Sequence, residues 1–509
     1  MMTITEHEQR IASLDQEFAM IKQYVEQAAG HEALHQVEQQ LLQKLMAIGR
    51  ALLEAFIAQS GTGYDAENPP RSAEGKALAY KGLVESPYFS IFGKSTIPRA
   101  AYANPANEYF YPLDVQLNLP EQKYSYLLQK WGTARSTETD FREALALFDD
   151  LLGLELSPSM AQRVCAKVAP TVAAFYEQHP APALETEGSH LAISADGKGI
   201  RMRQTERALN ESQEQVQKPR LGKGEKNGVK KQAVVTVDFS FNPVAREPEE
   251  IVKALLNQHS LAERRHARLE HQQRQQQGRE EPRAALNKHV RATLEGKEHA
   301  FTYLMERLHK RDPAGGKHVI VLLDGDPNLE AALNQAVQAD PLHDRVDAVI
   351  LDLIHVSEYV WDVGTALHGE KGEGRVTWVR EKLLALLRSE VGRVIGGFKQ
   401  MLTKNELRPS QQTALKKAVS YFENHRHMMD YASYLAKGYP IATGLVEGAC
   451  GSLVKERMEQ SGMHWSRCGA QAVLDLRAVK KNNDWEAFWQ FHVAAEQKRM
   501  YADSYKIAA

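Results

Sequence analysis

The chain has 509 residues, of which 43% are hydrophobic and 25% charged, and its formal net charge is −2. This composition is ordinary for a globular protein of roughly three or four structural units, and the total charge does not by itself indicate a nucleic-acid partner. There is no apolar run of about 18 residues, the N-terminus is polar and acidic, and the three cysteines are far apart. We therefore expect a cytoplasmic protein without a membrane span, secretory signal or disulfide framework.

The first 60 residues are expected to be helical. In QVEQQLLQKLMAIGRALLEAFIAQ (36–59), apolar residues recur every three or four positions, which predicts a helix with one buried face. A loop is expected at 61–70, where Gly, Asn and Pro accumulate. Aromatic and β-branched residues with turn formers between them predict a small β-hairpin unit at 86–120.

Residues 121–178 are expected to be helical again, and part of this region has a more specific pattern. A turn at Gly153 separates two amphipathic segments, and Ser157 followed by Pro158 marks the N-cap and first position of the second helix. This spacing suits a helix-turn-helix, with an ordinary helical hairpin as the alternative. The side chains that the second helix would present to a DNA groove are Gln162, Arg163 and Lys167.

The second half of the chain alternates strands and helices before becoming wholly helical. Strands are expected at 190–204 and 230–243, and the apolar run ending in acids at 317–328 predicts a buried strand. Another buried strand leading into a helix is expected at 344–361. Everything from about 356 to 440 is then expected to be helical.

Two charged stretches lie among the first strands. From Lys198 to Lys231 there are ten Lys or Arg and four Glu, so the local excess is about six positive charges (10 − 4). Such a run is usually a solvated loop, although phosphate contact is plausible when it lies beside a metal site. Residues 262–298 are Gln-rich and of mixed charge, and we expect an exposed helical hairpin there.

Three acids from distant segments have the character of a divalent-metal site. Asp196 lies on the first predicted strand and Asp324 ends a later one, and the Gly after each acid lets the backbone turn. Glu447 lies among glycines in TGLVEGACGSLVKERM (443–458), near the expected start of a helix. Mg²⁺ prefers carboxylate oxygens and shares its coordination sphere with water and phosphate, so these acids suit phosphodiester chemistry.

Each acid also has an ordinary explanation. An Asp-Gly pair after a strand is most often a turn, and Asp326 and Asp352 compete with Asp324 for the second position. The helix dipole commonly stabilises an acid such as Glu447 in a first helical turn, and close helix packing would explain the glycines around it. The combination of acids, rather than any one of them, carries the hypothesis.

Four segments, in this order, resemble bacterial insertion-sequence transposases of the ISKra type: ISADGKGIRM, LLDGDPNLEAAL, LDLIHVSEYVWDVGTALHGE and ATGLVEGACGSLVKERMEQSGMHWSRCGAQAVLDLRAV. The resemblance covers most of the chain, and the last segment is the most specific. These enzymes are DDE transposases with a ribonuclease H-like catalytic domain. The resemblance implies that Asp196, Asp324 and Glu447 form the catalytic triad and bind Mg²⁺, or Mn²⁺, with two ions expected.

The resemblance also implies an α/β catalytic core of ribonuclease H-like type with an all-α insertion, preceded by a mainly helical DNA-binding region. The expected parts are an N-terminal helical region at 1–60, a β-hairpin unit plus helix-turn-helix at 80–180, the core at 188–355 with a charged insertion at about 205–300, the all-α insertion at 356–440, and the catalytic helix with a helical end at 441–509.

Further residues receive auxiliary roles. Related transposases carry a short motif ending in His after the corresponding strand, and here it is Asp352-Leu-Ile-His355. This implies a role for His355 near DNA or the active site, the alternative being a structural histidine bonded to Glu358 or Asp352. An aromatic ring beside basic residues can stack on a base, although core packing explains Trp465 equally well. The other expected DNA contacts are Lys198, Lys455, Arg457, His464, Trp465 and Arg467.

The function implied is that of a DNA transposase that binds the terminal inverted repeats of its insertion sequence and catalyses metal-dependent cleavage and strand transfer. Two ends are cut together, so a homodimer or higher oligomer is expected, with the N-terminal helices as candidates for assembly. The expected location is the bacterial cytoplasm, at the nucleoid when DNA is bound. The alternatives are a ribonuclease H-like nuclease without strand transfer and a DNA-binding protein derived from a transposase.

Overall fold

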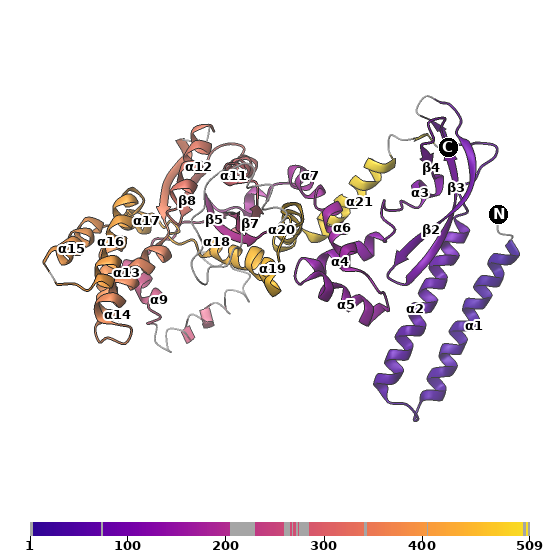
Figure 1. Cartoon of the computed structure of the whole chain (residues 1–509), viewed down its shortest axis with the longest axis horizontal. Helices are drawn as coiled ribbons and strands as arrows, with labels where there is room; N and C mark the ends of the chain where they lie inside the picture. Colours follow the sequence, from indigo (N-terminus) through magenta and orange to yellow (C-terminus); the bar gives the residue numbers. More distant parts are fainter. Residues whose placement is uncertain are drawn as a thin grey trace. The chain divides into compact units, whose positions relative to one another are not determined.

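The structure is a computed structural model in which the chain forms two compact units (Figure 1). Unit 1 comprises Met1–Gln178 and Asn483–Ala509, and unit 2 comprises His179–Asn482. None of the described helices is long and apolar enough to cross a membrane. The residues described are 4–72, 75–203, 230–258, 285–340, 344–404, 406–501 and 505–506, with 265–266, 268–270 and 273.

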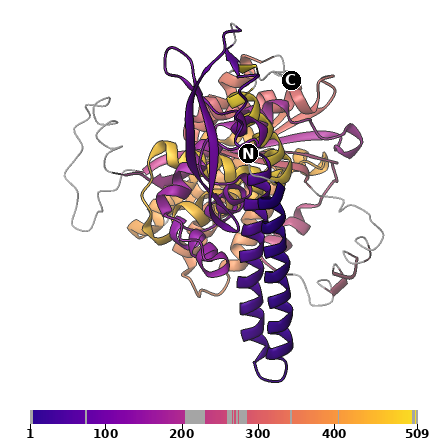
Figure 2. The ribbon, with the colours of Figure 1, turned by 90° about the vertical axis from the view of Figure 1, so that its right-hand side faces the viewer.

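Unit 1 begins with a helical hairpin of α1 (Ile4–Ala28) and α2 (Leu34–Gln59), which lie side by side (Figure 2). Leu14, Ile21 and Ala28 follow one another at seven-residue intervals on α1 and are buried, as expected for one helix packed along another. The hairpin also leaves many large apolar side chains exposed, namely Phe18, Met20, Val25, Leu34, Leu42, Leu45, Leu52 and Phe56.

A small antiparallel sheet follows, as the aromatic-rich sequence predicts. It contains β2 (Ala79–Ser90), β3 (Gly93–Ala103) and the short β4 (Tyr109–Phe110), and the hairpin starts earlier than expected, at Ala79. The short helix α3 (Pro112–Gln116) comes next. Near the end of the chain, β10 (Tyr505–Lys506) pairs with β1 (Arg71–Ser72).

The helix-turn-helix pattern gives two consecutive helices with the predicted boundaries. Helix α5 (Phe141–Leu152) ends at Gly153, whose φ of 63° is left-handed, and α6 begins at Pro158. The hydroxyl of Ser157 accepts a hydrogen bond from the Met160 N–H, so the predicted N-cap is confirmed. The other helices of this part are α4 (Tyr126–Ser136), α6 (Pro158–Val168), α7 (Thr171–Gln178) and α21 (Trp485–Tyr501).

Unit 2 is built on a mixed five-stranded sheet of order β7-β6-β5-β8-β9. The first three strands in this order are antiparallel, whereas β5, β8 and β9 run parallel to one another. The strands are β5 (His190–Arg201), β6 (Lys230–Phe241), β7 (Leu286–Thr293), β8 (His318–Leu323) and β9 (Val346–Leu351). The unit therefore has the expected α/β character.

The expectation of an exposed helical hairpin at 262–298 is wrong for β7, which is part of the sheet. The polar residues of β7 hide its strand pattern in the sequence. In the fold two of them have partners: His289 bonds to the Tyr303 hydroxyl, and Arg291 lies over the Tyr303 ring. The stretch at about 205–300 is therefore not one charged insertion, since it contains β6, α9 (Pro248–Leu255) and β7. Residues 204–229 lie outside the described residues.

Helices cover both faces of the sheet. Helices α11 (Lys297–Arg311) and α12 (Pro327–Gln338) pack on one face, where Ile193 and Val321 belong to the same buried cluster as Phe301. The opposite face receives α18 (Gly444–Ala449), the π-helical segment Cys450–Lys455 and α20 (Arg467–Lys481), with α19 (Glu456–Met458) between the last two. Because strand residues alternate, Asp196 lies on this second face.

The segment from β9 to α18 is helical, as expected for an all-α insertion. It contains α13 (Leu353–His368), α14 (Arg375–Leu387), α15 (Val391–Lys404), α16 (Pro409–Asn424) and α17 (Tyr431–Ala436). The expected C-terminal part at 441–509 is divided, because residues from Asn483 onward belong to unit 1. The rings of Phe175 and Phe488, 5.6 Å apart, join α21 to α7.

Candidate metal centre

The three acids of the predicted triad come from neighbouring elements of unit 2. Ser194 on β5 pairs with Leu322 on β8, so Asp196 and Asp324 each lie two residues beyond this pair, at one edge of the sheet. Glu447 lies in the first turn of α18, which begins at Gly444 and packs against β5 and β6. The helix thus starts close to Glu447, as predicted.

The acids influence one another electrostatically. Burial raises the pKa of Asp324, and the carboxylate of Asp196 raises it further. Burial also raises the pKa of Glu447, with contributions from the charges of Asp352 and Asp196. Because like charges held together raise each other's pKa, a divalent cation bound among them would relieve the repulsion.

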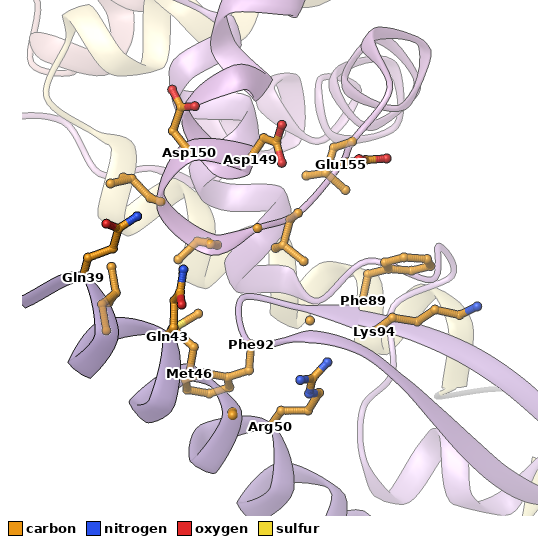
Figure 3. Close-up of a pocket in the computed structure, with 18 residues that line it drawn as sticks. Gln39, Gln43, Met46, Arg50, Phe89, Phe92, Lys94, Asp149, Asp150 and Glu155 are labelled. Atoms are coloured by element: carbon orange, nitrogen blue, oxygen red, sulfur yellow. The ribbon is translucent and has the colours of Figure 1, made fainter. Parts of the chain in front are cut away.

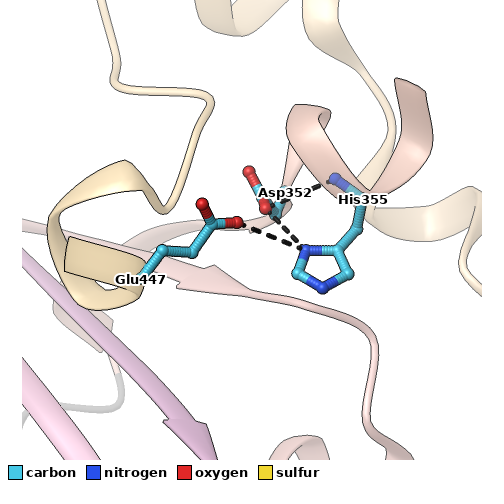
Figure 4. A group of neighbouring side chains, drawn as sticks. All are labelled: Asp352, His355 and Glu447. Carbon is cyan, nitrogen blue, oxygen red and sulfur yellow. Dashed lines mark hydrogen bonds and ion pairs between the residues drawn. The ribbon is translucent and has the colours of Figure 1, made fainter. Parts of the chain in front are cut away.

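A second group, drawn in Figure 4, shares Glu447 with the predicted triad. One ligand atom from each of Asp352, His355 and Glu447 lies within 4.8 Å of the others, which makes this the potential metal-binding group among the described residues. The imidazole Nδ1 of His355 is 2.8 Å from Asp352 Oδ2 and 3.8 Å from Glu447 Oε1. Asp196 and Asp324 are not members of this group.

Asp352 is a buried structural acid. Its Oδ1 accepts the backbone N–H groups of Ile354 and Thr443, at 3.1 and 2.9 Å, and its Oδ2 accepts from His355. Burial would raise the pKa of Asp352, but the hydrogen bonds from His355 and Thr443 outweigh it and lower the pKa. Asp352 therefore ties the start of α13 to Thr443, the residue before α18, and so helps to fix Glu447.

His355 forms a hydrogen bond with Asp352, as expected if it is a structural histidine. The hydrogen bond to Asp352 raises the pKa of His355 to about 9, although burial opposes it. This raised pKa favours the protonated imidazole at neutral pH, in which Nδ1 donates its hydrogen to Asp352 Oδ2. In this state His355 places a positive charge beside Glu447 rather than a free metal ligand.

The structure separates Asp324 from its two rivals. Asp326 caps α12 by accepting the Asn328 N–H and forms an ion pair with Lys297 at 2.7 Å. Both oxygens of Asp352 are engaged, as described above. Asp324 accepts the Asp326 N–H on one oxygen at 2.8 Å, and after burial the charge of Asp196 also raises its pKa. Among the described contacts, Asp324 therefore has fewer competing partners than Asp326 or Asp352.

The glycines around Glu447 do not lie in a tight helix contact. A Cβ added to Gly444, Gly448 or Gly451 would meet no described atom within 4 Å, apart from the adjacent residues and the backbone of its own helix. Close packing between described helices therefore does not explain these glycines. They leave open space beside Glu447, and the π-helical segment that starts at Cys450 is of a kind that often occurs at functional sites.

Cys450 is a member of the site that the sequence pattern did not reveal. Its thiol donates a hydrogen bond to Asp196 Oδ2, with a sulfur–oxygen distance of 3.3 Å. Burial, together with the charge of Asp196, raises the pKa of the thiol, so it stays neutral and orients the carboxylate. The spacing offered a signal, since Cys450 follows Glu447 by three residues and therefore lies on the same side of the helical segment.

The predicted DNA-contacting residues are buried, half-buried or exposed. Arg457 and Trp465 are buried, at 0% and 5% exposed, and the indole N–H donates to the Met458 carbonyl at 3.1 Å. The guanidinium lies over the Trp465 ring, so the expectation that these two contact DNA is wrong for this structure. Lys198 on β5 is half-buried, and the exposed members are Gln162, Arg163, Lys167, Lys455, His464 and Arg467.

Unit 1 holds a separate pocket with a volume of about 650 Å³ (Figure 3). Met46 and Arg50 of α2 line one side, Phe92 of the β2–β3 turn lines another, and Asp149 and Glu155 come from the helix-turn-helix. Its mixture of apolar and oppositely charged groups does not indicate one ligand class. The sequence pattern had not pointed to this pocket.

No protein-family model and no curated protein matches the sequence.

Proposed function

We propose that this chain is a DDE-type DNA transposase whose unit 2 is a ribonuclease H-like catalytic core. The observation that carries the proposal is the placement of Asp196, Asp324 and Glu447. They lie on β5, directly after β8, and on a helix that follows an all-α segment, and the charge of Asp196 affects both other acids. The sheet order and its strand directions agree with this fold.

Asp196, Asp324 and Glu447 would hold Mg²⁺ or Mn²⁺, with two ions expected. The ions would lower the pKa of bound water and polarise the scissile phosphodiester. Within the protein, the Cys450 thiol orients Asp196, and Asp352 fixes the approach to α18. Protonated His355 would place a positive charge near the phosphate, as an auxiliary residue.

DNA recognition is assigned to the helix-turn-helix of unit 1. Helix α6 buries Ala161, Val164 and Cys165 and exposes its polar residues, so it has a face available for a groove. Lys167 pairs with Glu121 at 3.0 Å, an exposed contact that phosphate could replace. The residues that we propose contact DNA are Gln162, Arg163 and Lys167 on this helix, with Lys198, Lys455 and Arg467 in unit 2.

Two transposon ends must be cut together, so we propose that the protein acts as a homodimer or higher oligomer in the bacterial cytoplasm. The exposed apolar side chains of α1 and α2 support assembly through the helical hairpin. Phe18 and Val25 lie close to the buried positions of α1 in its heptad pattern, and Leu45 and Leu52 are also seven residues apart.

The proposal is tested by Mg²⁺- or Mn²⁺-dependent cleavage and joining of the DNA ends of its own element. Asp196→Asn, Asp324→Asn and Glu447→Gln are each expected to lower the cleavage rate at least 100-fold, because each removes a metal ligand. Glu381→Gln, an exposed acid on α14, is the matched control and should retain wild-type activity.

Full activity in any triad variant would remove that residue from the centre. If Asp324→Asn stays active while Asp326→Asn or Asp352→Asn is inactive, the second acid is misassigned. Cleavage without joining to a target plasmid would favour a ribonuclease H-like nuclease. Binding to the ends without any cleavage would favour a DNA-binding protein derived from a transposase.

A further inference from the structure

The turn that carries Asp324 is packed tightly by a tyrosine from the helical segment. Gly325 has a φ of 87°, and a Cβ there would meet the Tyr421 hydroxyl at 3.0 Å and Leu351 Cδ1 at 3.1 Å. The position therefore requires glycine for two reasons, its left-handed backbone and its lack of space. Helix α16, nearly 100 residues later in the chain, thus contacts the backbone of the candidate metal centre.

Tyr421 also forms a hydrogen bond with this turn. Its hydroxyl donates to the main-chain carbonyl of Asp324 at 2.7 Å. The ring is held by stacking on Tyr359 of α13, with centroids 4.1 Å apart and planes 13° from parallel. Because both the ring and the hydroxyl are fixed, the bond restrains the main chain from which the Asp324 carboxylate projects.

We propose that Tyr421 is a positioning residue of the metal centre: it holds the Asp324 turn so that the carboxylate faces Asp196, and thereby couples the all-α segment to metal binding. This inference rests on the proposed metal-binding role of Asp324. It assigns the helical segment a role in the geometry of the site that is separate from any contact with DNA.

The chain provides a matched control on the neighbouring strand. Tyr431 of α17 donates its hydroxyl to the Leu351 carbonyl at 2.8 Å, at the end of β9. Tyr431→Phe and Tyr421→Phe each remove one phenolic hydroxyl and keep the ring. Each change therefore removes one hydrogen bond to a carbonyl at or just after the end of a strand. Only Tyr421→Phe removes a bond to a proposed metal ligand.

The experiment measures Mn²⁺ binding to the full-length chain by titration followed with electron paramagnetic resonance, alongside thermal unfolding without metal. Tyr421→Phe is expected to weaken Mn²⁺ binding about fivefold, which corresponds to about 1 kcal/mol. Tyr431→Phe should leave the Mn²⁺ affinity within about twofold of wild type. It should lower the melting temperature at least as much as Tyr421→Phe does. Gly325→Ala, a second variant that disturbs the same turn, should weaken binding further.

Unchanged Mn²⁺ affinity in Tyr421→Phe would overturn the inference, as would an equal loss of affinity in Tyr431→Phe. Asp324→Asn separates this failure from that of the proposed function. If wild type binds Mn²⁺ and Asp324→Asn does not, the metal centre stands and only Tyr421 is misassigned. If wild type binds no Mn²⁺, or Asp324→Asn binds it as well as wild type, the metal centre fails and the inference fails with it.

Discussion

At the scale of single residues, the two oxygens of Asp196 have different surroundings. Oδ1 accepts the Gly197 N–H, and Oδ2 accepts the Cys450 thiol. A thiol is a weak donor, so a metal ion at Oδ2 would displace it with little cost. In the proposed metal centre, Cys450 would therefore orient Asp196 before a metal binds, without competing strongly for it.

Replacing Cys450 tests this orienting role. Cys450→Ala removes the donor and should lower the DNA cleavage rate by less than about fivefold, because a typical hydrogen bond contributes about 1 kcal/mol and a thiol is a weak donor. Cys450→Ser supplies a hydroxyl donor of similar size and should restore most of the rate. The measurement is single-turnover cleavage across a range of Mg²⁺ concentrations. Equal rates for the alanine and serine variants would show that the thiol acts only through packing.

Local residue patterns were predictable where the chemistry is local. Ser157 and Pro158 mark the start of α6 because capping depends on neighbouring backbone groups. The burial of Arg457 and Trp465 could not be predicted in the same way, because it depends on packing between distant segments. Trp465 exchanges backbone hydrogen bonds with Arg201 and Arg203, more than 260 residues earlier in the chain.

At the scale of elements, the helical segment around Glu447 has a local composition that disfavours a helix. Gly448 is exposed, has no positive φ, and would gain no clash from a methyl group. Its stability cost relative to alanine is therefore unrelieved by any packing in the described structure. Such a residue is understandable if another molecule must approach this surface.

Two substitutions at Gly448 separate stability from function. Gly448→Ala should raise the free energy of unfolding by about 0.5–1 kcal/mol, because alanine is the better helix former. Gly448→Leu should fold equally well but reduce cleavage at least tenfold, because its side chain would fill the open space beside Glu447. Urea denaturation and DNA cleavage assays provide the two measurements. Wild-type cleavage by the leucine variant would contradict the idea that DNA uses this space.

The hairpin of α1 and α2 gives a test of assembly. Leu45→Asp with Leu52→Asp should convert an oligomer into a monomer, because the charges would oppose burial of the exposed apolar face. Size-exclusion chromatography with light scattering measures the mass of each species. Leu184→Asp, at an apolar side chain that is 67% exposed outside the hairpin, should leave the mass unchanged. If the wild-type protein is a monomer when no DNA is present, the hairpin does not assemble the free protein.

Elements differed in how well the sequence predicted them. The apolar run of β8 (HVIVLL) predicts a buried strand directly. In the structure five of its six residues are buried, as this pattern predicts. By contrast, β7 (LNKHVRAT) carries polar residues whose partners come from α11, and its pattern was mistaken for a helix. Hydrophobic periodicity cannot identify a strand whose polar side chains are satisfied by tertiary contacts.

At the scale of the whole molecule, unit 2 contains a buried network of charges. Arg311 is completely buried between Glu187 and Asp238, at 2.7 and 2.9 Å, and Arg307 also pairs with Asp238. Burial opposes the charge on Asp238, but these arginines prevail and lower its pKa to about 2. Removing one member would leave an unbalanced buried charge, so the network is a point of vulnerability rather than a reserve of stability.

The buried histidines predict sensitivity to acid. Burial lowers the pKa of His289 to about 3 and that of His492 to about 4, whereas an unfolded histidine titrates near 6.5. Below pH 6.5 the unfolded chain therefore binds more protons than the folded chain. Each histidine then lowers the free energy of unfolding by about 1.4 kcal/mol for every unit by which the pH falls. Asp475 has the opposite effect on stability. Burial raises its pKa to about 6, so below that pH the folded chain binds more protons at this residue and the free energy of unfolding rises.

As the pH falls from 6 to 4, each histidine should destabilise its own unit by about 1.4 kcal/mol per pH unit, and Asp475 should offset part of this loss in unit 2. Urea denaturation at several pH values measures it. His289→Gln should flatten the dependence by about the same amount, because glutamine does not titrate. An unchanged slope in this variant would mean that His289 does not have the lowered pKa in the folded protein.

The overall α/β character of unit 2 and the order of its elements followed from the sequence, because apolar strands and amphipathic helices alternate clearly. The grouping of residues around Glu447 did not. Asp352, His355 and Glu447 converge only after α13–α17 return the chain to the sheet edge, and no local pattern encodes that return. The same reason hid Tyr421, whose role depends on a contact between α16 and the β8 turn.

The division of the chain has a consequence for the order of events during synthesis. The segment from Asn483 onward belongs to unit 1, although the whole of unit 2 is translated before it. Helix α7 must therefore wait for α21, whose Phe488 packs on Phe175 and whose His492 bonds to Thr171. The unit proposed to perform the chemistry is therefore fully synthesised before the unit proposed to recognise the DNA is complete.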